Sequence, residues 1–194
     1  MAGPDRLDFA RRYVDTLGTV LRALPLDGIA ATLEILERAH AARKRVLVVG
    51  NGGSAATASH MANDLVWGLA HVGKLGLRAS SLSDNVPVVT AIANDRGYQD
   101  VFAVQIETHA DPGDVLIAVS GSGNSANVLR AVDAAKAKGM TTIGFLGMEG
   151  GKLRRMVDVA VVVPSNDYGP IEDVHMMLDH LITAYLRDRI AGPG

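Results

Sequence analysis

The chain has 194 residues, 48% of them hydrophobic and only 4% aromatic, which suits one α/β core packed by aliphatic side chains. The formal net charge of -2 and the lack of a long Lys/Arg block argue against nucleic acid or an anionic membrane as the main partner. No cysteine is present, so disulfides, thiolate metal sites and cysteine nucleophiles are excluded. Any metal must be bound by histidine and carboxylate side chains.

The first 43 residues predict two helices. Apolar residues recur at helical spacing from Ala10 to Leu24, Pro25 ends this pattern, and a second helix is expected from about Gly28 to Arg43. We expect a helical hairpin, with residues 1–43 packing in an oligomer; covering the chain's own sheet is the alternative. The region lacks the apolar core of a signal peptide, and no apolar run reaches the length of a membrane span. A cytoplasmic protein is therefore expected.

The rest of the chain alternates between strands and helices. Strands are expected at residues 46–49, 77–82, 115–120, 141–145 and 158–163, and helices at 54–69, 87–109, 125–138 and 171–190. This order predicts a doubly wound, five-stranded parallel sheet flanked by helices, with a ligand site at the carboxyl ends of the strands. No linker divides the chain, so residues 1–194 are expected to form one domain with a disordered tail at 191–194.

The first strand runs directly into a glycine turn that favours anion binding. The turn reads G-N-G-G-S at residues 50–54, and its glycines allow the backbone to approach an anion closely. Ser54 adds a hydroxyl where the next helix begins, and the free N–H groups and positive dipole end of that helix favour a phosphate.

A second turn, S-G-S-G-N-S at residues 120–125, repeats this logic after another buried strand. One such turn is weak evidence, because glycine and serine are common in plain connections. Two in one parallel sheet favour a phosphate site. Neither turn matches G-x-x-x-x-G-K-[ST], and the first turn lacks the full G-x-G-x-x-G spacing, so no nucleotide is expected.

These two turns, A-N-D at residues 93–95 and a closing helix with His180 together resemble the sugar isomerase (SIS) domain. Within that superfamily the chain looks most like the bacterial phosphoheptose isomerases, also called sedoheptulose 7-phosphate isomerases. The resemblance covers nearly the whole chain. It implies a homotetramer with sites near subunit contacts and a phosphorylated sugar held by the serine-rich turn. The implied substrate-binding residues are Asn51, Gly52, Gly53, Ser54, Asp64, Asn94, Asp95, Ser120, Gly121, Ser122, Ser125 and Glu172.

Two helices carry candidate metal ligands. His60 and Asp64 are four residues apart and share a helix face, although such a pair alone is more often a surface contact. The closing helix carries Glu172, Asp173, His175, Asp179 and His180. The resemblance implies that a divalent metal, usually zinc, is bound by His60, Asp64, Glu172 and His180, an acceptable set of two nitrogens and two oxygens.

Three positions depart from the family pattern. Asp64 stands where the family has its catalytic glutamate, Glu172 where it has a glutamine, and Gly68 where it has an arginine. The shorter Asp64 side chain draws the carboxylate back, and Glu172 adds a negative charge that strengthens metal binding or raises a neighbouring carboxylate's pKa. The changes suggest either a sister subfamily with another sugar phosphate or a protein that has kept the fold and lost the reaction.

The resemblance implies aldose-ketose isomerisation through an enediol, converting sedoheptulose 7-phosphate to a manno-heptose 7-phosphate. We expect Asp64 to act as the base, His180 as its acid/base partner and a metal as the electrophile. His175 is the reserve candidate, and His71 and His109 receive no role. The alternative is a non-catalytic SIS module that binds a sugar phosphate or docks a protein, as relatives that bind the replication initiator DnaA do.

Overall fold

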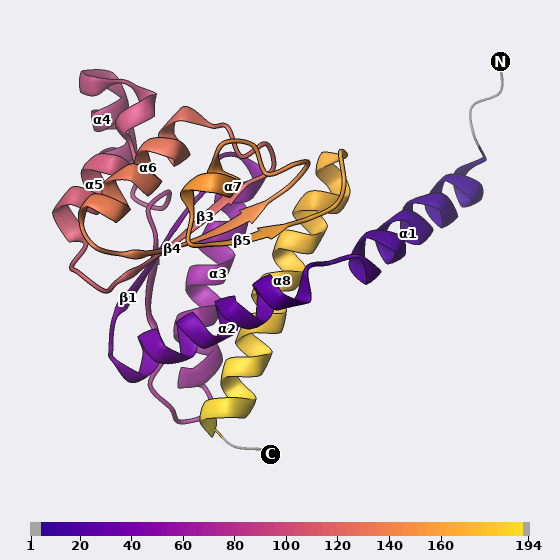
Figure 1. Ribbon diagram of the computed structural model, residues 1–194, viewed down its shortest axis with the longest axis horizontal. Coiled ribbons are helices and arrows are strands. Elements are labelled where there is room, and N and C mark those ends of the chain that lie inside the picture. Colours follow the sequence, from indigo (N-terminus) through magenta and orange to yellow (C-terminus); the bar gives the residue numbers. More distant parts are fainter. Residues whose placement is uncertain (1–4, 192–194) are drawn as a thin grey trace.

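In a computed structural model, which describes residues 5–191, a five-stranded parallel sheet lies between two layers of helices (Figure 1). The spatial order is β2-β1-β3-β4-β5, and every neighbouring pair is parallel. The doubly wound α/β fold predicted from the sequence is therefore confirmed. The strands are β1 (Arg45–Val49), β2 (Arg78–Ser81), β3 (Val115–Ser120), β4 (Thr141–Leu146) and β5 (Val159–Val162).

The helices follow the predicted order with two differences. The expected continuous helix at 87–109 is interrupted at Gly97, whose φ of 97° lies in the left-handed region that favours glycine. A short helix at 153–156 was not predicted, because four residues carry no periodic pattern. The elements are α1 (Arg6–Arg22), α2 (Leu26–Ala41), α3 (Gly53–Ala70), α4 (Val86–Arg96), the 3-10 turn η1 (Tyr98–Asp100), α5 (Ala103–His109), α6 (Ala126–Ala137), α7 (Leu153–Met156) and α8 (Tyr168–Ala191).

Two hydrophobic cores hold the layers together. One lies between the sheet and α2, α3 and α8, and includes Leu36, Met61 and Leu178. The other lies on the opposite face, under α5, α6 and α7, and includes Ile106 and Val132. All six residues of β3 are buried, as expected for a central strand covered on both faces.

The strand order reverses between β1 and β3, and this determines where a ligand can bind. From β1 the chain moves outward to β2, and from β3 it moves in the other direction to β4. The connections therefore diverge and leave a crevice at the carboxyl ends of β1 and β3, which is the usual ligand site of such sheets. Both predicted turns follow these two strands.

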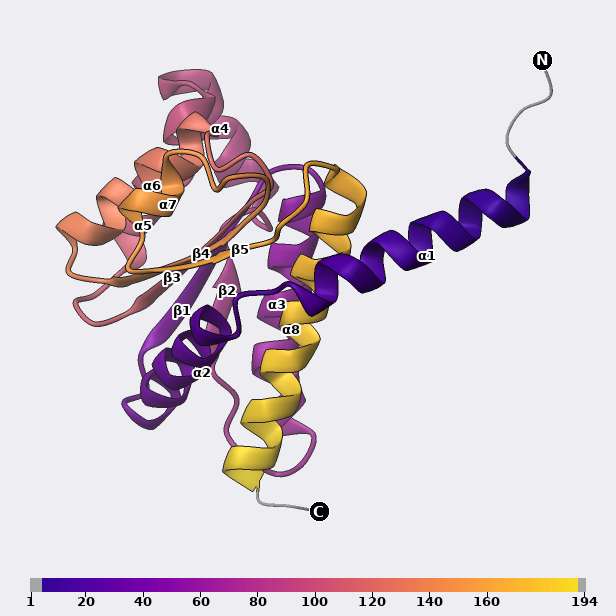
Figure 2. The same ribbon diagram turned by 45° about the vertical axis from the view of Figure 1, so that its right-hand side comes forward.

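Helix α1 projects away from the body of the molecule (Figures 1 and 2). It does not fold back against α2, so the expected hairpin is not formed. Leu7, Phe9 and Val14 are each more than half exposed, because nothing within residues 5–191 covers this apolar surface. The Tyr13 hydroxyl donates to Asp173 Oδ2 at 2.6 Å and ties α1 to the start of α8.

Two further expectations concern the chain ends and membranes. Of the predicted tail at 191–194, Ala191 is the last residue of α8, and the other three residues lie outside the described part. Among residues 5–191, no helix is both long enough and apolar enough to cross a membrane.

Candidate functional site

A cavity of about 170 Å³ opens where the two predicted turns meet, and we call it the phosphate pocket. It lies at the carboxyl ends of β1 and β3, as the sheet topology requires. Seven residues expected from the sequence line it, together with two that were not expected, Val119 and Tyr168. The expected lining residues are Asn51, Ser54, Ser120, Gly121, Ser122, Ser125 and Glu172.

Two helices begin at the phosphate pocket, and the N-cap residue of neither makes a side-chain cap hydrogen bond. These are α3, which follows Gly52, and α6, which follows Ser125. Their first backbone N–H groups have no intrahelical acceptor, and each helix dipole is positive at this end. An anion in the pocket would satisfy both.

The serine-rich turn is held in shape by its own side chains and by the loop after β4. Ser120 Oγ accepts from the backbone N–H of Gly123 at 3.1 Å, and Ser122 Oγ accepts from that of Asn124 at 3.2 Å. Asn124 Oδ1 accepts from the backbone N–H of Lys152 at 3.1 Å. The turn is therefore preorganised before a ligand arrives.

Sequence reasoning missed two residues that fix Asn51. Asn127 exchanges two amide hydrogen bonds with Asn51, at 2.9 and 2.7 Å, and the Tyr98 hydroxyl donates to Asn51 Oδ1 at 2.9 Å. Asn127 stands two residues after the serine-rich turn, a position that its nearness to the motif could have suggested. Tyr98 follows the unpredicted break at Gly97 and gave no signal.

Glu172 lies above the N-terminus of α3. A Cβ at Gly53 would overlap the Glu172 carboxylate, so the glycine permits this close approach. Gly52, whose φ is 55°, precedes the helix as its N-cap. The carboxylate faces the positive end of α3 and the phosphate pocket.

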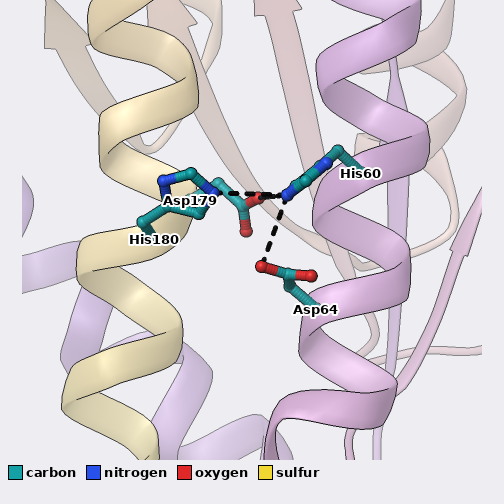
Figure 3. Close-up of side chains that lie close together, drawn as sticks. All are labelled: His60, Asp64, Asp179 and His180. Atoms are coloured by element: carbon teal, nitrogen blue, oxygen red, sulfur yellow. Dashed lines mark hydrogen bonds and ion pairs between the residues drawn. The ribbon is translucent and has the colours of Figure 1, made fainter.

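Two turns further along, α3 and α8 bring a second group of side chains together, which we call the histidine-aspartate cluster (Figure 3). Each member offers one ligand atom, and these atoms all lie within 4.8 Å of one another. His60 Nε2 is 3.3 Å from His180 Nε2, 3.5 Å from Asp64 Oδ2 and 3.8 Å from Asp179 Oδ2. The members are His60, Asp64, Asp179 and His180.

The cluster contains three of the four expected metal ligands, and Asp179 stands where Glu172 was expected. Asp179 is fully buried, and neither carboxylate oxygen has a hydrogen-bond partner within residues 5–191. Burial, together with the nearby charge of Asp64, raises the pKa of Asp179 to about 7. Two nitrogens and two oxygens, one of them from an unpartnered buried carboxylate, form a set that fits a divalent metal.

His175 lies one turn before Asp179 and is also fully buried. Burial lowers the pKa of His175 to about 4, and the Leu146 backbone opposes this shift only partly. Its ring packs near Phe145, with centroids 6.4 Å apart. His175 is therefore a neutral core residue and does not belong to the cluster.

Gly68 lies where α3 packs against α8. A Cβ at this position would stand 2.5 Å from Thr183 Cγ2. The family's arginine therefore has no room here unless the Thr183 side chain rotates or one helix shifts, and the departure at Gly68 goes with close packing of α3 on α8.

Asn94 and Asp95 do not line the phosphate pocket in this chain. Both are exposed on α4, where Asn94 Nδ2 donates to Asp95 Oδ1 at 2.8 Å. His71 caps the C-terminus of α3, with Nδ1 3.1 Å from the Trp67 carbonyl oxygen. His109 ends α5.

The sequence and the fold are similar to those of proteins with a named activity. The SIS domain family profile matches residues 10–147. The phosphoheptose isomerase of Geotalea daltonii is 41% identical over 164 residues, which cover 84% of this chain and 85% of that protein.

Solved structures give the same result. The phosphoheptose isomerase of Neisseria gonorrhoeae aligns with a TM-score of 0.81 and 31% identity, covering 92% of this chain and 98% of that one. That of Francisella tularensis aligns with a TM-score of 0.88 and 27% identity, covering 95% and 99%.

Proposed function

The chain belongs to the SIS domain family, and we propose that it is a sugar-phosphate aldose-ketose isomerase of the phosphoheptose isomerase type. The reaction is the conversion of sedoheptulose 7-phosphate into D-glycero-D-manno-heptose 7-phosphate. The similarity to phosphoheptose isomerases supports this, because it spans most of both chains in sequence and nearly all of both in structure.

The separation between the phosphate pocket and the histidine-aspartate cluster carries the proposal. Ser54 lines the pocket and His60 belongs to the cluster, so they are six residues, or about 9 Å, apart along α3. Six carbon–carbon bonds of about 1.5 Å and a phosphoester linkage also span roughly 9–10 Å when extended. A seven-carbon sugar phosphate held by its phosphate therefore places C1 and C2 beside the cluster.

The pocket binds the phosphate through neutral donors. Hydroxyls of Ser54, Ser122 and Ser125 and the first N–H groups of α3 and α6 surround it. Asn51, fixed by Asn127 and Tyr98, lies on the side toward the sugar. Because these donors are positioned before binding, little ordering entropy is lost when the substrate enters.

In the cluster, Asp64 is the group that we assign as the base. It removes a proton from C1 of the ketose to give the enediol, and a proton is then returned at C2. Asp64 Oδ2 lies 3.5 Å from His60, so the side chain reaches the cluster although it is one methylene shorter than glutamate. Its other oxygen accepts from Asn63 Nδ2 at 2.9 Å, which fixes the carboxylate.

His180 is exposed at the opening of the cluster, and we assign it to move the hydroxyl proton between O1 and O2. His60, Asp64 and His180 would hold a divalent ion, expected to be Zn²⁺. When bound, such an ion supplies Lewis-acid polarisation of the carbonyl.

We also propose a homo-oligomer, expected to be a homotetramer, in which residues 1–43 take part in packing. The exposed apolar side chains Leu7, Phe9 and Val14 on α1 support it, because an isolated projecting helix gains no burial. Asn94 and Asp95, which do not reach this chain's own pocket, remain predicted substrate contacts that a neighbouring subunit would bring into range. The cytoplasmic location also stays a prediction.

The test is turnover by the purified, zinc-loaded full chain. Sedoheptulose 7-phosphate in D₂O should yield an aldose with deuterium at C2, because the enediol exchanges its proton with solvent. Ribose 5-phosphate should react more slowly, since its carbonyl stops short of the cluster, and His180→Ala should abolish turnover. Binding of the heptose phosphate without any product would overturn the proposal in favour of a non-catalytic SIS module.

A further inference from the structure

The side chain of Asp179 points into the histidine-aspartate cluster, and among residues 5–191 its carboxylate has no hydrogen-bond partner (Figure 3). An ionised carboxylate without a hydrogen bond is one of the least favourable groups to bury, and such groups are normally paired or coordinate a metal. His60, whose Nε2 lies 3.8 Å from Asp179 Oδ2, is its nearest ion-pair partner in the described chain. A cation bound at the cluster would pair this carboxylate, so the position of Asp179 favours a metal site.

The distances from His60 to the other three ligand atoms are close to those of a tetrahedral metal site. Ligand atoms about 2.0–2.1 Å from a zinc ion at tetrahedral angles are roughly 3.3–3.4 Å apart. The distances from His60 Nε2 to His180 Nε2, to Asp64 Oδ2 and to Asp179 Oδ2 are 3.3, 3.5 and 3.8 Å. Asp179 Oδ2 is thus only a few tenths of an ångström farther from His60 Nε2 than a tetrahedral site requires.

Glu172 is in register with a different part of α3. Gly53 faces Glu172, and seven residues further on in both helices His60 faces Asp179. The two helices therefore run parallel, and Glu172 lies about 10 Å above Asp179 along α8. To join the cluster, its carboxylate would have to leave the phosphate pocket that it lines.

We propose that Asp179, and not Glu172, is the fourth metal ligand of this chain, with His60, Asp64 and His180. Glu172 then stays at the phosphate pocket, where it contacts the substrate. This assignment rests on the proposed function, but it concerns the metal alone and differs from the ligand set that the family resemblance implies.

Metal binding measured without substrate tests the assignment separately from turnover. Zn²⁺ affinity of the full chain is determined by competition with a chromophoric chelator, and Co²⁺ replacement reports the ligand geometry through its visible d–d absorption. Asp179→Asn should weaken Zn²⁺ binding at least about 100-fold and change the Co²⁺ spectrum. Glu172→Gln, the matched control on the same helix, should change neither.

The reverse pattern, with affinity lost in Glu172→Gln and kept in Asp179→Asn, would overturn the assignment. Should Asp179→Asn fail to fold by circular dichroism, anomalous diffraction at the zinc edge from crystals of the unaltered chain decides it. Density bonded to Asp179 supports the proposal, and density bonded to Glu172 contradicts it. A chain that binds zinc through Asp179 but turns over no heptose phosphate would refute only the proposed function.

Discussion

The phosphate pocket and the histidine-aspartate cluster lie along the same two helices but are built differently. The pocket uses backbone N–H groups and serines at the ends of β1 and β3, so the sheet positions it. The cluster uses side chains from the middle of α3 and α8, so it depends on how these helices face each other. The pocket should therefore control binding and the cluster the chemical step, and each should be open to damage without the other.

The largest effect is expected from Asp64→Asn. The amide keeps the shape of the side chain but cannot accept the C1 proton, so kcat should fall by about 10³-fold. The affinity for inorganic phosphate should stay unchanged, because the pocket residue Ser54 lies about 15 Å from Asp64 along α3. Steady-state kinetics and calorimetric titration with phosphate measure the two quantities. An equal loss in both would contradict the separation of the two regions.

The matched change in the pocket is Ser125→Ala. This hydroxyl lines the pocket but does not cap α6, so its removal leaves the helix intact. Losing one hydrogen bond to a charged phosphate should raise KM about 10- to 100-fold with little change in kcat. A fall in kcat with KM unchanged would show that the pocket also positions the reacting carbons.

The next effect concerns folding stability of the metal-free chain, where His175 and Asp179 act in opposite directions. The pKa of His175 is lowered to about 4 in the folded chain. With respect to this residue the free energy of unfolding is therefore highest above pH 6.5, and it falls as the pH falls to 4. The pKa of Asp179 is raised to about 7 in the folded chain. With respect to this residue the free energy of unfolding is therefore highest below about pH 4, and it falls as the pH rises to 7.

Removing either titratable side chain should reveal the pH dependence of stability that the other one causes. Metal-free Asp179→Asn should gain roughly 3 kcal/mol of stability between pH 4 and 6.5, where unfolded histidine releases its proton. Metal-free His175→Leu should lose stability as the pH rises from 4 to 7. Urea unfolding in the presence of a chelator at several pH values measures both effects. If stability changed with pH in the same way in the two variants, the opposite pKa shifts of His175 and Asp179 would be contradicted.

The two regions also differ in how far the sequence predicts them. Strand-turn-helix segments are local: the apolar runs predicted five strands, and the glycine and serine turns that follow two of them contain six of the expected pocket residues. Asn94 and Asp95 were placed in the site by resemblance, and the structure leaves them on an exposed helix. The predicted hairpin failed for a related reason, since apolar spacing marks a buried face but does not say which surface buries it.

The cluster depends on contacts between distant residues, and sequence spacing gives these poorly. The E-x-x-H pair drew attention to Glu172 and His175, which lie in the pocket and the core. Asp179 was visible as a helical carboxylate beside His180, but nothing local placed it opposite His60. The register of the two helices is the signal that could have found it. If α3 and α8 run parallel and Glu172 lies above Gly53, then Asp179, seven residues after Glu172, faces His60, seven residues after Gly53.

The smallest effect, on the packing that aligns the cluster, is expected from Gly68→Ala. An alanine normally stabilises a helix interior by up to about 1 kcal/mol over glycine, and Gly18→Ala in α1 should do so, because its Cβ meets only the Arg22 side chain at 3.6 Å. At Gly68 the new Cβ stands 2.5 Å from Thr183 Cγ2, so overpacking should cost about 1–3 kcal/mol instead.

The same shift of α8 should weaken zinc binding by the cluster while phosphate binding at the sheet edge stays unchanged. Chemical unfolding and the two ligand titrations measure these effects. The double variant Gly68→Ala with Thr183→Ser, which removes the clashing methyl group, should recover part of the loss in a double-mutant cycle. If Gly68→Ala stabilised the chain as Gly18→Ala does, α3 and α8 would not be held by close contact at this point, and their register would have to be set at the pocket end alone.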